Sequence, residues 1–439
     1  MKQFDDELIS GSIYRSVWKL AWPVVLAQLI SGIHGFINQV MVAHYVDDHA
    51  ANAAIGISWQ LFLVMVVFIV SLFQGMSVLV ARYSGKRDHD ALNRIFYDVF
   101  IASFWILICV AAPLGFFLTP HLLDLAAPSP EVRAYAEPYL RILFTCSAPL
   151  FMMYMLINAF QSTGDTRTPL MLGVLTSLCN VIFSYFFITG FGPFPELGTI
   201  GAAMGTVLGP IPSVCIAIWL ILSHRHIVGR PKKFTLLPDM SVIWSVARLG
   251  IPTGIQAFLL NVAGAILLGF VGKLEHSTDA QAAYVVCYSQ LFSFVTWASF
   301  GLRASSATIM GQNLGAGNDK RAKHGVYVTT LMSVIWSAMW AAIYLTLQDP
   351  LLALFNIADG EALDIGRQLL NFLAVSAFFV SAALAFTGGL QGAGDTISPM
   401  IIAFVSQIVV LLGICFALQF AGMLTPTGIW TAILFSHIT

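Results

Sequence analysis

Charged residues are scarce in this sequence. Asp, Glu, Lys and Arg make up only 10% of its 439 residues, whereas 58% are hydrophobic. This balance excludes an ordinary soluble globular protein and indicates a chain whose surroundings are a lipid bilayer. The net charge of −1 says nothing about partners, and no nucleic acid is predicted among them.

Several motifs of catalysis and ligand binding are also missing. The six cysteines stand singly in apolar runs without a CxxC pair, which argues against a disulfide or zinc framework. No set of His, Asp, Glu or Cys has ligand or catalytic spacing, so we predict neither an enzyme, a metal site nor a cofactor. A phosphate-binding Gly-Lys-Ser/Thr motif is absent, which leaves ATP-driven transport unsupported. The acidic, polar start resembles no cleavable signal peptide.

What the sequence does contain is a series of long apolar runs. A helix that crosses roughly 30 Å of hydrocarbon needs about 20 mostly apolar residues. The last run reaches only about half that length, so the final helix is expected to be short or cut off in this chain. The runs predict an all-α membrane protein of twelve transmembrane helices, near 16–44, 53–81, 95–118, 135–160, 169–190, 198–223, 243–272, 282–310, 325–347, 367–390, 399–420 and from 428 onward.

One nine-residue stretch occurs twice, about 230 residues apart. Gln161–Pro169 (QSTGDTRTP) returns as Gln391–Pro399 (QGAGDTISP), with five matching positions. Gly85 falls on Gly315 at the same shift, as expected for a duplicated fold. Six spans per copy is an even number, so the copies share one orientation. Two six-helix lobes are therefore predicted, related by a pseudo-twofold axis along the membrane normal.

Each copy of this stretch predicts a polar corner between two spans. In the first copy, Gly164 can adopt the left-handed conformation that ends a helix, and Asp165 can accept backbone N–H groups two residues on. Thr168 would cap the next helix, with Pro169 at its first position. We prefer this structural role to a direct contact with substrate. The second copy has the equivalent residues Gly394, Asp395, Ser398 and Pro399.

The basic residues predict the orientation of the chain. Nearly all of the 21 lysines and arginines fall on one side of the predicted spans, and only Arg133, Lys273 and Arg367 fall on the other. By the positive-inside rule, the N-terminus and both corners are cytosolic, which predicts a multi-pass protein of the cytoplasmic (inner) membrane. The predicted domains are an N-lobe (1–223), a cytosolic linker (224–242) and a C-lobe (243–439).

These features together resemble one family. The paired Gly-Asp-Thr corners, the stretch Gly311–Gly317 (GQNLGAG) and the stretch Gly192–Gly198 (GPFPELG) look like those of prokaryotic multidrug and toxic compound extrusion (MATE) transporters. The resemblance covers nearly the whole chain, from Trp18 to Ile429. It implies two six-helix lobes that open outward as a V around a central cavity. It also implies antiport of organic, often cationic compounds against H⁺ or Na⁺.

The carboxylates that often bind the coupling ion in this family have no counterpart. Many prokaryotic members carry an aspartate fifteen residues after a proline in the first helix; here Pro23 is followed at that distance by Asn38. A second acid often lies in the fifth helix, where this chain has Asn180 and then Ser184 in the acid's place. The seventh and tenth helices also lack the acid found in other members.

The first predicted helix carries a polar stripe. Gln28, Ser31, His34, Gly35 and Asn38 fall within roughly 120° of one helix face. Such a stripe must face protein or a water-filled cavity rather than lipid. His34 titrates near neutrality, so it could carry the coupled proton where the aspartate is absent. The alternative is a neutral histidine bonded to a neighbouring helix.

Other polar residues are weaker candidates. Asn180 and Ser184 share one face of the fifth predicted helix, where they either line the cavity or hold helices together. Arg303 is a deep charge, which could snorkel to the cytosolic side, bond carbonyls of other helices, or meet an anionic substrate or lipid. The remaining cavity candidates in the second half are Gln256, Asn261 and Gln290.

The leading hypothesis is a monomeric secondary exporter of small organic compounds, cationic or amphipathic. Its lobes would rock around a midplane cavity. Bending is expected at Pro23 and Pro252, because each breaks a backbone hydrogen bond in the first helix of its lobe. Three alternatives remain open: an exporter of anionic metabolites, a flippase for lipids or lipid-linked sugars, and an integral-membrane enzyme.

Overall fold

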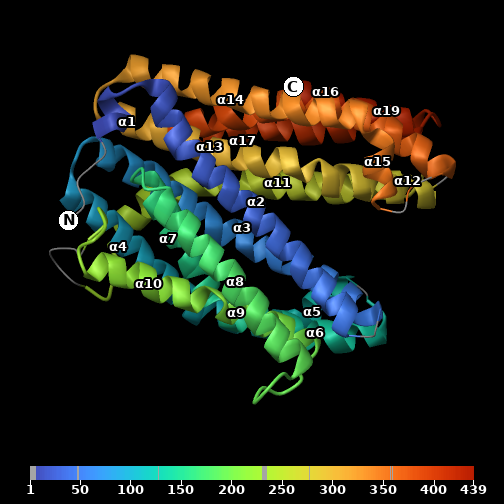
Figure 1. The fold of residues 1–439 in the computed structure, drawn as a ribbon, viewed down its shortest axis with the longest axis horizontal. Helices are drawn as coiled ribbons and strands as arrows, with labels where there is room; N and C mark the ends of the chain where they lie inside the picture. Colours follow the sequence, from blue (N-terminus) through green and yellow to red (C-terminus); the bar gives the residue numbers. More distant parts are fainter. Residues whose placement is uncertain are drawn as a thin grey trace. The chain divides into compact units, whose positions relative to one another are not determined.

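The computed structural model describes residues 6–46, 49–126, 128–229, 235–275, 277–355, 357 and 359–439. The side chains of residues 34–36, 38, 39, 43 and 49 lie outside this description. Every regular element in the described part is a helix, and most helices are long and apolar (Figure 1). The predicted all-α membrane fold is confirmed.

The helices follow the two sequence copies in order. Three segments, η1 to η3, have the wider turns of a π-helix. The first half contains α1 (Asp6–Ser10), α2 (Ile13–Tyr45), α3 (His49–Gly85), α4 (His89–Trp105), η1 (Ile106–Ala111), α5 (Ala112–Ala126), α6 (Pro130–Cys146), α7 (Ala148–Ser162), α8 (Arg167–Thr189), α9 (Thr199–Leu208) and α10 (Pro210–Leu222). The second half contains α11 (Met240–Val271), α12 (Ser277–Tyr284), η2 (Val285–Leu291), α13 (Ser293–Gly315), α14 (Asp319–Thr346), α15 (Gln348–Ala353), α16 (Gly360–Ala393), α17 (Ile397–Ala403), η3 (Phe404–Leu412), α18 (Gly413–Phe420) and α19 (Pro426–Ile438).

Ten helical stretches of the described chain are long and apolar enough to cross a membrane. The pair α6 and α7 bends by 51° and makes an eleventh span if it is counted as one. Pro149 explains this bend, because it sits at the start of α7 and has no N–H to continue the backbone ladder. The last helix, α19, has 13 residues, which is short for a span, as the sequence predicts.

The two Gly-Asp-Thr corners have one geometry. Gly164 and Gly394 have φ values of 90° and 94°, in the left-handed region. The N–H of Asp165 donates to the carbonyl of Phe160 (3.2 Å), and that of Asp395 donates to Leu390 (3.0 Å). Each helix therefore ends in a Schellman motif, which uses carbonyls that the helix itself leaves unpaired.

The predicted caps of the following helices need correction. α8 begins at Arg167 and α17 at Ile397, so Thr168 and Ser398 lie inside the first turn instead of preceding it. The corner aspartates do the capping: Asp165 accepts from the backbone N of Thr168 (3.1 Å), as Asp395 does from Ser398 (3.0 Å). Each hydroxyl also donates to the same carboxylate. A charged carboxylate is the stronger acceptor, which explains why it takes the cap position. The prolines Pro169 and Pro399 consequently occupy the third helical position instead of the first.

Packing divides the chain into two compact units. Unit 1 consists of Leu26–Ile251 with the segment that ends at Ile9, and unit 2 consists of Ser10–Val25 with Pro252–Thr439. These borders differ from the predicted lobe ends at 223 and 243. They fall inside α2 and α11, so the first half of each helix belongs to a different unit from its second half.

Close glycine contacts explain these borders. In unit 1, a Cβ at Gly75 of α3 would lie 2.9 Å from the backbone N of Gly250, so the first half of α11 packs directly on α3. In unit 2, a Cβ at Gly301 of α13 would lie 3.0 Å from the backbone N of Val25, at the end of the first half of α2. Helix backbones that approach this closely need a residue without a side chain at the contact. The chain order alone does not reveal such contacts.

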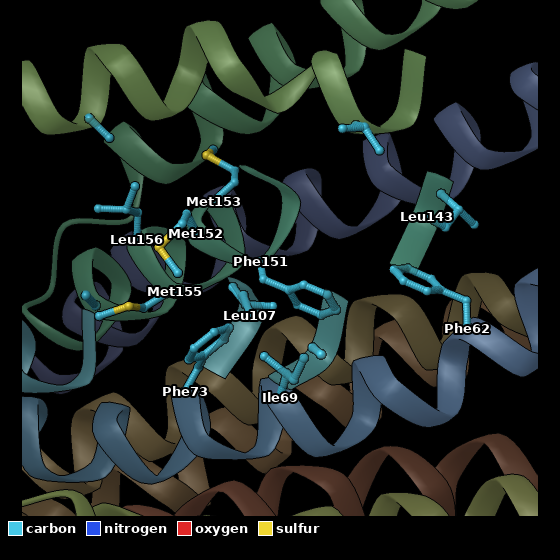
Figure 2. Packing of buried hydrophobic residues seen from close by; sticks show 14 of the residues in the cluster. Phe62, Ile69, Phe73, Leu107, Leu143, Phe151, Met152, Met153, Met155 and Leu156 are labelled. Carbon is cyan, nitrogen blue, oxygen red and sulfur yellow. The ribbon is translucent and has the colours of Figure 1, made fainter. Parts of the chain in front are cut away.

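The core of unit 1 is built around α3. Its residues Phe62, Ile69 and Phe73 belong to one buried cluster with Leu143 of α6 and Phe151 of α7 (Figure 2). The rings of Phe62 and Phe151 lie 5.9 Å apart between centroids. Lipid tails are as apolar as these side chains, so close packing rather than removal from water stabilises the contact.

The core of unit 2 is built around α16, which packs on α13, α14 and α19. Three fully buried serines join these helices. The hydroxyl of Ser381 on α16 lies 2.9 Å from that of Ser299 on α13 and accepts a hydrogen bond from Ser337 on α14. Hydroxyl contacts of this kind hold membrane helices together.

The linker between α10 and α11 is docked on unit 1. Its residue His226 is buried, with its ring 3.9 Å from the ring of Phe160 and its Nε2 3.6 Å from a carboxylate oxygen of Asp165. Three residues further on, the backbone N of Gly229 donates to Oδ1 of Asn93 on α4 (2.8 Å). The start of the linker is therefore fixed to the first corner and to α4.

The end of the linker is fixed to α4 as well. The backbone N of Asp239 donates to Oδ1 of Asp98 (3.3 Å), and its carboxylate forms a salt bridge with Arg94. Hydrogen bonds from Ser241, with one from Arg94, lower the pKa of Asp239 to about 2. This carboxylate stabilises the fold in its charged form, and that contribution is lost only as the pH falls below the usual Asp value towards 2. The linker contact therefore persists at neutral pH.

Candidate functional site

The polar stripe of α2 lies on a continuous helix. Gln28 is half-buried and Ser31 is exposed. The side chains of His34 and Asn38 lie outside the described residues, so their role as a coupling site stays a prediction. Pro23, five residues before Gln28, is buried within the same helix.

Asn180 and Ser184 lie in the contact between α8 and α9. Both are buried, and the hydroxyl of Ser184 lies 3.5 Å from Oδ1 of Asn180. A Cβ at Gly205 would lie 2.8 Å from the backbone N of Ser184, and one at Gly209 would lie 2.8 Å from Cα of Asn180. This is the geometry of polar residues that hold two helices together. A contact of either residue with substrate or ion stays a prediction.

The structure shows a polar cluster in unit 1 that the sequence prediction missed. Nε2 of Gln74 on α3 donates to Oδ1 of Asn158 on α7 (3.2 Å), and the hydroxyl of Ser77 lies 3.5 Å from the same oxygen. Nδ2 of Asn158 donates to the carbonyl of Tyr154 in its own helix (2.8 Å). Gln74, Ser77 and Asn158 are all only partly buried, so this cluster remains accessible.

The duplicated position in unit 2 lacks this cluster. Counting 230 residues on from Asn158 leads to Gly388 of α16, where a Cβ would lie 3.0 Å from Cα of Arg303 on α13. One turn later, a Cβ at Gly392 would lie 2.8 Å from Cα of Ala307. The same helix crossing is therefore closed by bare backbone in unit 2 and bridged by amides in unit 1. A comparison of the two copies, position by position, would have revealed Asn158.

The polar candidates of unit 2 do not form one cluster. Gln256 is buried and accepts a hydrogen bond from Nε2 of Gln391 on α16 (3.1 Å). Asn261 is exposed and donates to the carbonyl of Ala257 in its own helix (2.8 Å). Gln290 is half-buried in the π-helical segment η2. No printed contact among the described residues joins Gln256, Asn261 and Gln290.

Arg303 of α13 is half-buried, and its guanidinium lies over the ring of Phe300 at 5.6 Å from the centroid. No salt bridge joins it to an acidic side chain in the described part of the chain. The described residues also contain no group of three or more His, Cys, Asp or Glu side chains placed to hold a metal ion.

Comparison with known proteins identifies the family. The model of one family, MatE, matches the chain twice, over residues 23–186 and 252–417. The chain belongs to the MatE family. The two matches begin at Pro23 and Pro252 and thus repeat the duplication seen in the sequence. The predicted resemblance to multidrug and toxic compound extrusion transporters is confirmed, and the protein is a multi-pass membrane transporter rather than an enzyme.

Individual relatives of this MatE protein are distant but cover most of it. The chain is 25% identical to the "Probable multidrug resistance protein NorM" of Thermotoga maritima over 425 residues, which is 96% of this chain and 89% of the relative. It is also 25% identical to the "FAD transporter" of Shewanella oneidensis, over 72% of this chain and 68% of the relative. A solved structure, described as an outward-facing multidrug resistance MATE family transporter of the MOP superfamily, matches with a TM-score of 0.90 at 16% identity. It covers 100% of this chain and 96% of its own.

Proposed function

We propose that this protein is a secondary antiporter that exports amphipathic or cationic organic compounds in exchange for H⁺ or Na⁺. The observation that carries the proposal is the similarity to a relative named as a multidrug resistance protein, which extends over 96% of the chain. The protein works as a monomer in the cytoplasmic membrane, with its N-terminus in the cytosol. The basic residues on one side of the spans support this orientation.

Transport proceeds by movement of the two units relative to each other. The borders at 25/26 and 251/252 support this proposal, because both fall within a long helix beside a proline. Pro23 and Pro252 lack the N–H that would bond the carbonyl four residues earlier, so each helix bends more easily there. No cofactor is needed beyond the coupling ion.

His34 is the proposed proton carrier. The chain has Asn38 and Ser184 where relatives of the family often have carboxylates, so a proton would need another titratable group. Histidine changes its charge near neutral pH, and an ionisable side chain within a membrane helix is retained mainly for function.

The test is export of rhodamine 123 from proteoliposomes, with the proton and sodium gradients dissipated separately. Export should stop when one of the two gradients is removed, and that gradient identifies the coupling ion. His34→Gln should abolish the proton dependence, whereas His121→Gln, at an exposed position of α5, should retain it. Export that continues without either gradient would contradict antiport.

A second candidate function is export of anionic metabolites. It is favoured by Arg303, which has no salt bridge among the described residues, and by the relative named as an FAD transporter. The same proteoliposomes loaded with an anionic dye decide between the two candidates.

A further inference from the structure

Helix α13 has one accessible face. Thr296, Phe300, Arg303, Ala307 and Met310 recur every three or four residues, so they form one stripe along the helix, here called the α13 stripe. Each of the five is half-buried or exposed. The residues on the other sides of α13 are buried against its neighbours: Ala298, Ser299, Gly301, Leu302, Ser305, Ser306, Thr308 and Ile309.

Arg303 lies deep along this stripe. It is twelve residues before the end of α13 at Gly315, which is about 18 Å at the rise of an α-helix. That distance is too long for one arginine side chain to carry its charge to the end of the helix. Described acidic residues of unit 2, such as Asp319, Asp364 and Asp395, lie in first turns or at the second corner. The charge of Arg303 is therefore neither neutralised by a described acid nor moved to the membrane surface by snorkelling.

The neighbouring helix α14 shows what a lipid-facing stripe looks like in this unit. Tyr327, Leu331, Ile335 and Met339 recur every four residues and are 64%, 53%, 60% and 44% exposed. All four are large and apolar. The α13 stripe instead combines a charged residue, a threonine and an alanine with only partial exposure. An arginine facing hydrocarbon is costly, so the α13 stripe faces water and passing compounds.

We propose that Arg303 is the recognition site for an anionic group, carboxylate or phosphate, on an amphipathic organic compound that this transporter exports. The planar guanidinium donates two parallel hydrogen bonds to such a group and keeps its charge at any physiological pH. Phe300 and Met310, on either side of it in the stripe, offer apolar and polarisable surfaces to the rest of the compound. The inference rests on the proposed export function and narrows the class of compound exported.

The backbone of Arg303 is well supported for this role. Gly388 of α16 lies directly against it, so α13 has no freedom to shift at this point. The guanidinium is also held over the Phe300 ring, a contact that orients a cation by the charge distribution of the ring. A site fixed in this way loses little conformational entropy when it binds an anion.

The test measures binding directly, so that it does not depend on transport. Fluorescein and rhodamine 123 share a three-ring core, but the first is an anion at neutral pH and the second is a cation. Fluorescence anisotropy follows each dye with the purified protein in phosphatidylcholine nanodiscs. We expect Arg303→Gln to weaken fluorescein binding at least tenfold and to leave rhodamine 123 binding unchanged or tighter. Arg303→Lys should fall between wild type and Arg303→Gln, because lysine keeps the charge without the two-pronged geometry.

Two controls complete the experiment. Arg141→Gln removes an arginine that pairs with Glu137 on α6 and should bind fluorescein as the wild type does. Added salt should weaken fluorescein binding to the wild type more than to Arg303→Gln. A wild-type protein without measurable fluorescein binding, or equal binding by wild type and Arg303→Gln, overturns the proposal. Either result leaves the export function to be judged by the proteoliposome measurement alone.

Discussion

At the scale of single residues, three glycines determine how α9 meets α8. Gly201, Gly205 and Gly209 are four residues apart and face the backbone of α8. An added Cβ at Gly205 would meet backbone as well as side-chain atoms of Ser184, and backbone atoms cannot rotate away from it. Any larger residue must therefore push the two helices apart.

Gly205→Ala is accordingly expected to destabilise the protein by about 1–3 kcal/mol, the usual cost of overpacking. The measurement is thermal unfolding of the purified protein in detergent, followed by tryptophan fluorescence. Gly173→Ala in α8 is the matched control, because a Cβ there meets nothing within 4 Å. Its Tm should hold or rise, since alanine is the better helix former. Equal Tm values for the two variants would show that this helix contact tolerates a side chain.

Residue chemistry made the corners partly predictable. Gly164 and Gly394 follow from the sequence, because a left-handed helix end strongly favours glycine. The choice between Asp165 and Thr168 as cap could not be predicted, since both offer an oxygen within three residues of the helix start. Asn158 was missed because an asparagine in an apolar run gives no hint of the partner across the helix crossing.

At the scale of elements, the linker behaves as part of unit 1. His226 and Gly229 fix its beginning, and Asp239 fixes its end, with α4 as the common support. The predicted extent of 224–242 follows the polar composition of this stretch. Its docking depends on hydrogen bonds to Asn93 and Asp98, which lie over 130 residues earlier in the chain. Composition carries no signal for such distant contacts.

Asn93→Ala is expected to release the beginning of the linker. The buried N–H of Gly229 loses its acceptor, which costs about 1–3 kcal/mol of local stability. Trypsin should then cut after the basic residues of 225–233 roughly tenfold faster, because cleavage follows the population of the open form. The control is Asn371→Ala, at an exposed position of α16. A cleavage rate equal to that of the wild type would mean that the Gly229 contact does not hold the linker.

At the scale of the whole molecule, two helices pass from one unit to the other. α2 leaves unit 2 after Val25, and α11 leaves unit 1 after Ile251. Because the linker is fixed to unit 1, the prolines at these borders are the points where the chain is expected to bend. The sequence predicted both prolines as hinges but placed the unit borders at the linker.

Pro23→Ala and Pro252→Ala are each expected to slow turnover. Each variant restores a backbone hydrogen bond, worth about 0.5–1.5 kcal/mol, that resists bending. Initial rates of rhodamine 123 export should show a maximal rate reduced several-fold with little change in KM. Pro120→Ala, inside α5, is the control for removal of a helix proline away from the borders. Wild-type kinetics in both border variants would count against bending at these sites.

The duplication and the helical class could be predicted because they leave periodic, chain-wide signals: apolar runs of span length and an echo at about 230 residues. The membership of the half-helices could not. It is decided by glycines such as Gly75 and Gly301, whose meaning depends on what lies opposite them.

The crossing of α2 and α11 between units has a consequence for any attempt to divide the molecule. A cut within the linker yields one fragment that keeps 10–25, a piece of its partner's fold, and another that keeps most of 240–251, a piece of the first. Neither product is self-sufficient, yet each carries what the other lacks. Co-expressed halves should therefore reassemble by mutual exchange, in the manner of swapped protomers. An ancestral single-copy chain could have dimerised through the same trade before its gene was doubled.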